Sequence, residues 1–225
     1  MPNIAQVRVG SESVAATAKS DQTLGPKGNR TRRRIMDATA QMLTDRPFAD
    51  IRITEIARAA EIAQPNFYTY FANVEEVILA VAREVSADAL CVHLDPDWSG
   101  EAGLEHARRL VGAAIELWLQ HRGVFAIVGI LADKRHGEFA VTRVRQMRNL
   151  YKGFETKIRQ AQAAGRLPPS VTPRLAGYEC VGIIFSAGQK YELLMASGFT
   201  HDQLVETTAR LLHMIATGGW AEPRS

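Results

Sequence analysis

The sequence predicts an all-α protein of about nine helices, in which an N-terminal three-helix helix-turn-helix domain precedes a larger helical domain. Apolar residues recur at steps of three and four through most of the chain, as on one face of an α-helix. No stretch alternates apolar and polar residues as a half-buried strand does. Residues 52–71 contain two short helical segments around a tight turn, the pattern of a helix-turn-helix.

The composition is that of an ordinary globular protein. Of 225 residues, 46% are hydrophobic and 23% charged, and the formal net charge is +3. Residues 1–27 show little apolar periodicity, so we expect a disordered arm there. We expect the helix-turn-helix domain at 28–74, the larger domain at 75–220 and a short tail at 221–225.

Several classes of function lack support in this sequence. Cys91 and Cys180 are too few for a disulfide framework, which favours a reducing compartment. No run approaches the ~18 uncharged apolar residues of a membrane span, so we expect a cytoplasmic protein without membrane contact. Metal-ligand spacing, a glycine-rich phosphate loop and a Ser-His-Asp order are also missing, and we expect neither an enzyme nor a cofactor.

The three N-terminal helices follow from local signals. The first becomes periodic at Thr31 and ends before Pro47. The second is expected to begin at Thr54, which can act as its N-cap. The third begins near Gln64, and Pro65 is tolerated in its first turn, where a missing N–H has no intrahelical partner.

The larger domain is predicted from its apolar stripes. The fourth helix runs from Glu75 to about Leu90, with valines at steps of four on one face, and residues 94–100 form a loop. The later helices are expected at residues 104–118, 123–131, 139–164, 174–196 and 201–216.

A stretch of about fifty residues carries a family pattern. An aliphatic first helix is followed by residues 53–60 (ITEIARAA), by residues 67–71 (FYTYF) and by residues 75–79 (EEVIL). In this order and spacing, residues 33–81 resemble the N-terminal domain of the TetR family of bacterial transcriptional regulators. The resemblance implies a DNA-binding domain followed by a ligand-binding and dimerisation domain.

Three residues depart from the family's pattern. Glu61 stands where the turn usually has glycine, and a non-glycine residue in a left-handed turn costs about 1–2 kcal/mol. Ala63 replaces a capping Ser or Thr, a loss on the order of 1 kcal/mol. Val74 replaces a lysine that touches phosphate in the family. A family-fold protein that has lost DNA binding is therefore one alternative.

The expected DNA contacts divide into positioning and reading. Five of the eight residues 27–34 are basic and none is acidic, so we expect a flexible arm that reaches phosphates or the minor groove. Gln and Asn at the start of the third helix can pair with adenine, and that helix lacks Arg and Lys, which favours A·T positions. The predicted DNA-binding residues are Arg30, Arg32, Arg33, Arg34, Arg52, Thr54, Gln64, Pro65, Asn66, Tyr68, Thr69 and Tyr70.

The expected effector site lies between helices of the larger domain, as the resemblance implies. Aromatic residues and methionine in the central helices favour an apolar or aromatic small molecule. The predicted lining residues are Trp118, Phe125, Met147, Tyr151, Phe154, Tyr178 and Phe185.

The resemblance further implies a homodimer that pairs the last two helices of each chain. The predicted interface residues are Gly177, Gly182, Gly188, Leu204, Leu211 and Ile215. Together these patterns predict a dimeric repressor that an effector releases from a palindromic double-stranded DNA operator. A redox-responsive regulator that senses through Cys91 or Cys180 is the other alternative.

Overall fold

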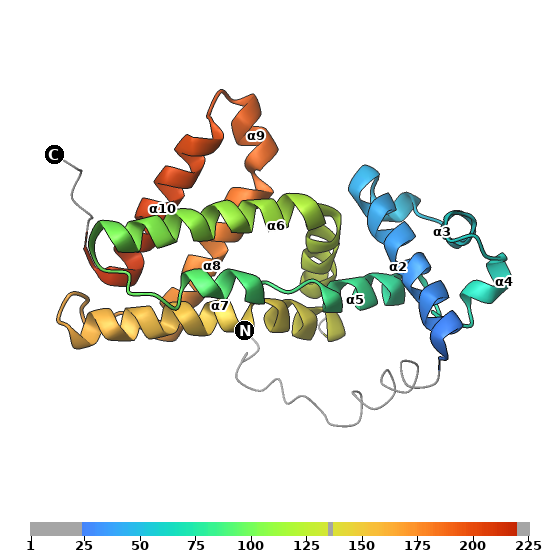
Figure 1. The fold of residues 1–225 in the computed structure, drawn as a ribbon, viewed down its shortest axis with the longest axis horizontal. Helices are drawn as coiled ribbons and strands as arrows, with labels where there is room; N and C mark the ends of the chain where they lie inside the picture. Colours follow the sequence, from blue (N-terminus) through green and yellow to red (C-terminus); the bar gives the residue numbers. More distant parts are fainter. Residues whose placement is uncertain (1–23, 135–136, 220–225) are drawn as a thin grey trace. The chain divides into compact units, whose positions relative to one another are not determined.

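The computed structural model describes residues 24–134 and 137–219 (Figure 1). Within these residues the chain forms nine α-helices, two 3-10 helices and no strand, so the predicted all-α class is confirmed. Two compact units divide between Ile78 and Leu79, and each is described by itself below. The predicted tail and most of the predicted arm, residues 1–23, lie outside the described residues.

The smaller unit is built on a few buried side chains. Ile35, Ile56, Phe67 and Phe71 are buried, and each comes from a different segment of the helix-turn-helix region. Phe67 and Phe71 are therefore part of the core of this unit. The helical segments of this unit are α2 (Pro26–Asp45), a 3-10 helix (Phe48–Asp50), α3 (Ile53–Ala59), α4 (Gln64–Phe67) and the start of α5 (Val74–Glu84).

The first helix begins earlier than the apolar pattern predicted. Pro26 occupies the first helical position after an extended Gly25, where its fixed φ is already helical and its missing N–H has no intrahelical partner. The basic residues 27–34 therefore lie on α2, and the prediction of a flexible basic arm there is wrong.

The second helix has a different N-cap from the one predicted. Arg52 is the N-cap of α3, and Thr54 lies exposed within the first turn, so the prediction of Thr54 as a cap is wrong. The carboxylate of Glu55 accepts a hydrogen bond from the Arg52 amide at 3.2 Å and one from the Arg46 guanidinium at 2.9 Å. The bond from Arg46 lowers the pKa of Glu55, so the carboxylate stays charged near the positive end of the helix.

The fourth predicted helix is shorter than expected. Helix α5 ends at Glu84, and residues 88–93 form a separate 3-10 helix (Asp88–His93). The break follows from competing hydrogen bonds: the Ala87 amide donates to the Gln146 carbonyl at 3.2 Å, and the Asp88 amide donates to the Ser86 hydroxyl at 3.1 Å. These bonds replace the i to i−4 ladder.

The larger unit packs long helices around one apolar core. The helices of the larger unit are α6 (Gly100–Lys134), α7 (Glu138–Ala163), α8 (Pro173–Gln189), α9 (Tyr191–Ala196) and α10 (His201–Thr217). Two helices were predicted where α6 runs, and α6 has non-helical dihedrals between them, at His121. The expected helix 174–196 is divided into α8 and α9 at Lys190.

The loop before α6 is anchored by Trp98, a buried residue that the loop pattern did not predict. Its ring packs edge-on against Phe154, with centroids 5.6 Å apart, and its indole N–H donates to the His93 carbonyl at 2.9 Å. His213 of α10 contacts the Trp98 carbonyl oxygen at 2.8 Å. This chain segment is therefore part of the core.

One helix within the described residues, Gly100–Ala132, is long and apolar enough to cross a membrane by length and composition. This helix carries charged residues and is not an uncharged apolar run, although the mean hydropathy of its apolar stretch is 1.3. Leu110 and Ile115 of this helix are fully buried, and α6 packs against α7, α8 and α10. The apolar surface is that of a central helix in a helical bundle.

Candidate DNA-binding surface and ligand cavity

The turn between α3 and α4 takes a left-handed backbone at Glu61, with φ of 55°. The following Ile62 amide donates to the Ala57 carbonyl at 2.9 Å, which closes the end of α3. The Glu61 carboxylate accepts a hydrogen bond from the Arg34 guanidinium at 3.0 Å. The residue that departs from the usual glycine thus links the turn to α2.

Helix α4 presents a polar outer face over an apolar inner one. Gln64, Pro65, Asn66 and Thr69 are exposed, whereas Phe67 is fully buried. Ala63 precedes the helix as its N-cap and makes no side-chain capping bond. The burial of Phe67 fixes the helix so that its neighbours face solvent, where side chains could reach base edges.

The two tyrosines after α4 differ in exposure. Tyr68 is 55% exposed and meets Phe67 edge-on at 5.7 Å, so its hydroxyl is free to contact a phosphate. Tyr70 is partly buried. Arg52 is exposed and donates to the Ala49 carbonyl at 3.0 Å.

The arginine cluster divides by role. Arg30, Arg33 and Arg34 are exposed on the first turns of α2. Arg32 instead places its guanidinium over the Phe71 ring, 5.0 Å from the centroid, which is a cation–π contact within this unit. The predicted DNA contacts of Arg30, Arg33 and Arg34 stay predictions, and these residues lie on helix α2 and not on a flexible arm.

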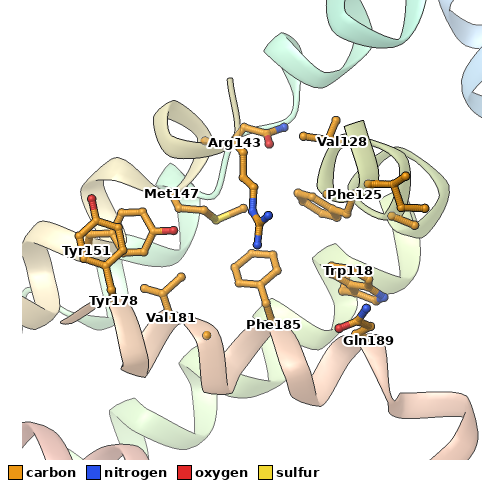
Figure 2. A pocket seen from close by; sticks show the side chains of 15 residues that line it. Trp118, Phe125, Val128, Arg143, Met147, Tyr151, Tyr178, Val181, Phe185 and Gln189 are labelled. Carbon is orange, nitrogen blue, oxygen red and sulfur yellow. The ribbon is translucent and has the colours of Figure 1, made fainter. Parts of the chain in front are cut away.

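A cavity of about 520 Å³ lies among α6, α7 and α8 of the larger unit (Figure 2). Six of the seven predicted effector residues line it, although they are separated by up to 67 positions in the sequence. These six are Trp118, Phe125, Met147, Tyr151, Tyr178 and Phe185. The structure therefore brings most of the predicted set together, and its role in binding stays a prediction.

Phe154, the seventh predicted residue, does not line this cavity. Its side chain is fully buried and packs against Trp98, about two turns further along α7 than Met147. The prediction of Phe154 as a lining residue is wrong because helical periodicity marks a buried face without telling which part of that face borders a cavity.

The aromatic side chains form flat walls. Trp118 and Phe125 are stacked at 5.3 Å with 10° between their planes, and Phe185 meets both edge-on. At the opposite end the Tyr151 and Tyr178 rings lie 4.0 Å apart. Burial raises the pKa of Tyr151, so its hydroxyl stays neutral and can donate a hydrogen bond. This lining suits a planar apolar ligand.

Sequence reasoning missed three polar residues of the lining, Arg143, Gln146 and Gln189. The guanidinium of Arg143 extends into the middle of the cavity (Figure 2). Arg143 and Gln146 precede Met147 by four residues and one residue on α7. A projection of α7 around Met147 would have indicated Arg143, because residues four apart share a helix face.

Two of the three predicted interface glycines, Gly177 and Gly188, have close contacts within the chain. A Cβ at Gly177 would lie 2.9 Å from the Tyr151 carbonyl oxygen, and one at Gly188 would lie 2.7 Å from the Trp118 Cβ. These two glycines let α8 approach α7 and α6, so their small size is explained without a partner chain. A Cβ at Gly182 would meet nothing within 4 Å.

The apolar residues predicted for the interface lie on α10. Leu204 and Ile215 are partly buried against the core of their own subunit, and Leu211 is 40% exposed. Leu211 is thus the residue of this set with most surface available to a partner.

The two thiols are poorly placed for reaction. Burial raises the pKa of Cys180 to about 12. Partial burial and the carboxylates of Asp88 and Asp95 raise the pKa of Cys91. Thiolate is the reactive form, so both side chains stay largely unreactive at neutral pH. No group of three or more His, Cys, Asp or Glu side chains suited to a metal occurs in the part of the chain that the structure describes.

Two family profiles match this chain. The one described as "Bacterial regulatory proteins, tetR family" matches residues 35–81, which contain α3 and α4. The one described as "Tetracyclin repressor-like, C-terminal domain" matches residues 92–222, more than half of the chain.

Individual proteins are also similar to this chain. The HTH-type transcriptional regulator EthR of Mycobacterium tuberculosis is 34% identical over 73 residues, which span 32% of this chain and only 34% of that relative's length. A TetR-family transcriptional regulator from Streptomyces coelicolor superposes with a TM-score of 0.62 at 16% identity, over 87% of this chain and 82% of the other. The fatty acid degradation regulator FadR from Bacillus halodurans gives 0.58 at 16% identity, over 85% and 96%. At these identities the structural likeness is one of fold.

Proposed function

This chain belongs to the TetR family of bacterial regulatory proteins, and we propose that it is a cytoplasmic, homodimeric transcriptional repressor that a small aromatic molecule releases from its operator. The observation that carries the proposal is the exposed polar face of α4, held in place by the buried Phe67. A helix presented in this way can enter the major groove and read base edges.

The proposed contacts separate reading from positioning. Gln64 and Asn66 read adenine, because their amides can bond both N6 and N7. Arg30 and Arg33 contact phosphates from α2, and each phosphate neutralised contributes about −0.9 to the slope of log K against log salt. A palindromic operator follows from the twofold symmetry of a dimer, with half-sites about 34–36 Å apart or a multiple of that distance.

The departures from the family pattern do not weigh strongly against DNA binding. The left-handed turn at Glu61 is partly offset by its ion pair with Arg34, although exposed pairs contribute only about 0–1 kcal/mol. The missing cap at Ala63 affects the stability of α4 and leaves the side chains of its outer face in place.

The proposed response to a ligand uses the cavity of the larger unit. Helix α5, Val74–Glu84, contains the boundary between the two units, so its C-terminal end is the part of the larger unit through which a ligand would act on the smaller one. If ligand and operator favour different conformations, each lowers the affinity for the other by the same factor. The raised thiol pKa values favour this response over sensing by cysteine oxidation.

The test is fluorescence anisotropy with DNA that flanks the protein's own gene, titrated at several salt concentrations. We expect sequence-dependent binding, an Asn66→Ala loss of roughly 1–3 kcal/mol at A·T-containing sites, and an Arg33→Ala slope smaller by about 0.9. Arg159→Ala on α7 is the control, since it removes an exposed arginine of the larger unit. Binding that is indifferent to sequence and unchanged by both variants would reject the proposal.

A further inference from the structure

Helix α7 contacts both the cavity and the end of α5. Arg143, Met147 and Tyr151 line the cavity. Glu138 pairs with Arg83 at 3.4 Å, within the last turn of α5.

The segment that follows α5 is also bonded to α7. The Asn149 amide donates to the Asp88 carboxylate at 2.8 Å, and the Gln146 carbonyl accepts from the Ala87 amide at 3.2 Å. Three residues of α7, spread over three turns, therefore hold the chain from residue 83 to residue 88.

Gln146 takes part in both sets of contacts. It lines the cavity, and its side-chain Nε2 donates to the Ala82 carbonyl oxygen in α5 at 2.6 Å. The residue is only 4% exposed, yet its Oε1 accepts no hydrogen bond from any residue that the structure describes. A buried acceptor without a donor costs about 1–3 kcal/mol, so a ligand donor at this position would relieve that cost.

The orientation of the amide follows from its partner. A flipped Gln146 would place Oε1 against the Ala82 carbonyl oxygen, and two acceptors cannot bond each other. The acceptor is therefore the end of the side chain that has no hydrogen-bond partner among the described residues.

We propose that Gln146 recognises an aromatic ligand that carries a hydroxyl donor, and that the same amide passes the presence of the ligand to α5. This inference rests on the proposed ligand-responsive function and names its ligand class and its transmitting residue. The ring lies between the aromatic walls, and its O–H donates to Gln146 Oε1. Arg143 also lines the cavity, extends into its middle (Figure 2) and can donate to the ligand oxygen.

The transmission follows from the shared amide. A donor on Oε1 polarises the amide and strengthens the bond from Nε2 to Ala82, because linked hydrogen bonds reinforce one another. The last turn of α5 is then held more firmly to α7 when the ligand is bound. A ligand without the donor can fill the cavity, but it does not favour the state in which α5 is held firmly to α7.

The recognition test uses the full chain and isothermal titration calorimetry with 2-naphthol and with its methyl ether, 2-methoxynaphthalene, which keeps the oxygen and the ring system but lacks the O–H donor. We expect the wild type to bind 2-naphthol roughly tenfold more tightly, and Gln146→Met to lose that preference. Gln160→Met is the matched control: it makes the same substitution at an exposed residue of α7 that does not line the cavity, and it should keep the preference. Equal affinities for the wild type, no binding of either probe, or a Gln146→Met variant that keeps the preference would overturn the proposal.

The transmission test is hydrogen exchange of the amides of residues 82–88 with saturating 2-naphthol. We expect slower exchange in the wild type and unchanged exchange in Gln146→Met at a probe concentration that saturates the variant. The wild-type probe comparison still decides the recognition claim if the variant does not fold. Failure of these tests with intact operator binding rejects this inference alone, whereas loss of specific operator binding rejects the proposed function.

Discussion

The two units of this protein place their candidate sites in opposite ways. The smaller unit uses a buried Phe67 to present exposed side chains such as Asn66, which lie next to it in the sequence. The larger unit surrounds a cavity with residues of three helices, and Trp118 and Phe185 meet there across 67 positions. Local sequence therefore determines most of the first site, and packing between distant helices determines the second.

The largest expected effect comes from comparing a substitution in the core of the larger unit with one in its cavity wall. Phe154→Ala should lower the free energy of unfolding by about 3–5 kcal/mol, because the side chain is fully buried and packs on Trp98. Urea unfolding followed by circular dichroism measures the loss. Phe185→Ala is the control and should cost clearly less, because its ring borders space that is already empty. Equal losses would mean that the cavity wall is as tightly packed as the core.

The next effect tests the close approach of α8 to α7. Gly177→Ala should cost about 1–3 kcal/mol of stability, since its Cβ would lie 2.9 Å from the Tyr151 carbonyl oxygen in the backbone. Gly112→Ala on α6 is the control: its Cβ meets nothing within 4 Å, and alanine favours a helix over glycine by up to ~1 kcal/mol. Thermal unfolding should show opposite shifts for the two variants. A stabilised Gly177→Ala would contradict the internal role of this glycine.

A smaller effect is expected in the turn of the smaller unit. Glu61→Gly should stabilise this unit by about 0.5–1 kcal/mol, because glycine adopts a φ of 55° without the steric cost of a side chain. Glu61→Gln keeps the steric cost and removes the charge that pairs with Arg34. Unfolding curves of the two variants separate strain from the ion pair. No gain in Glu61→Gly would indicate that the pair with Arg34 outweighs the strain.

The smallest effect concerns the thiols and is one of reactivity. Burial raises the pKa of Cys180 from an ordinary value near 9 to about 12. The contribution of this thiol to folding stability is therefore fully present below pH 9 and is lost as the pH rises from 9 towards 12. Iodoacetamide labelling followed by mass spectrometry should modify partly exposed Cys91 first, and Cys180 only at alkaline pH. Operator binding should be unchanged by labelling of Cys91. Rapid labelling of Cys180 at pH 7, with loss of operator binding, would favour the redox alternative.

Some predictions failed although their signals are local. Pro26 at the start of α2 and the Glu55 carboxylate at the start of α3 determine where these helices begin. The apolar pattern overlooked both because it registers buried faces, whereas a helix terminus depends on backbone groups that need partners. Because α2 begins at Pro26, the basic residues 27–34 lie on this helix.

The sequence by itself determined the all-α class and the helix-turn-helix, and the family resemblance indicated the left-handed turn at Glu61. Each depends on residues within a few positions of one another, whose spacing fixes one helix face or one turn. Only the tertiary structure decided that Phe154 lies in the core and that Gln146 joins the cavity to α5. Both outcomes depend on which distant helices pack together and how closely. Periodicity within one helix shows which face is buried, but it does not show which helices pack against that face.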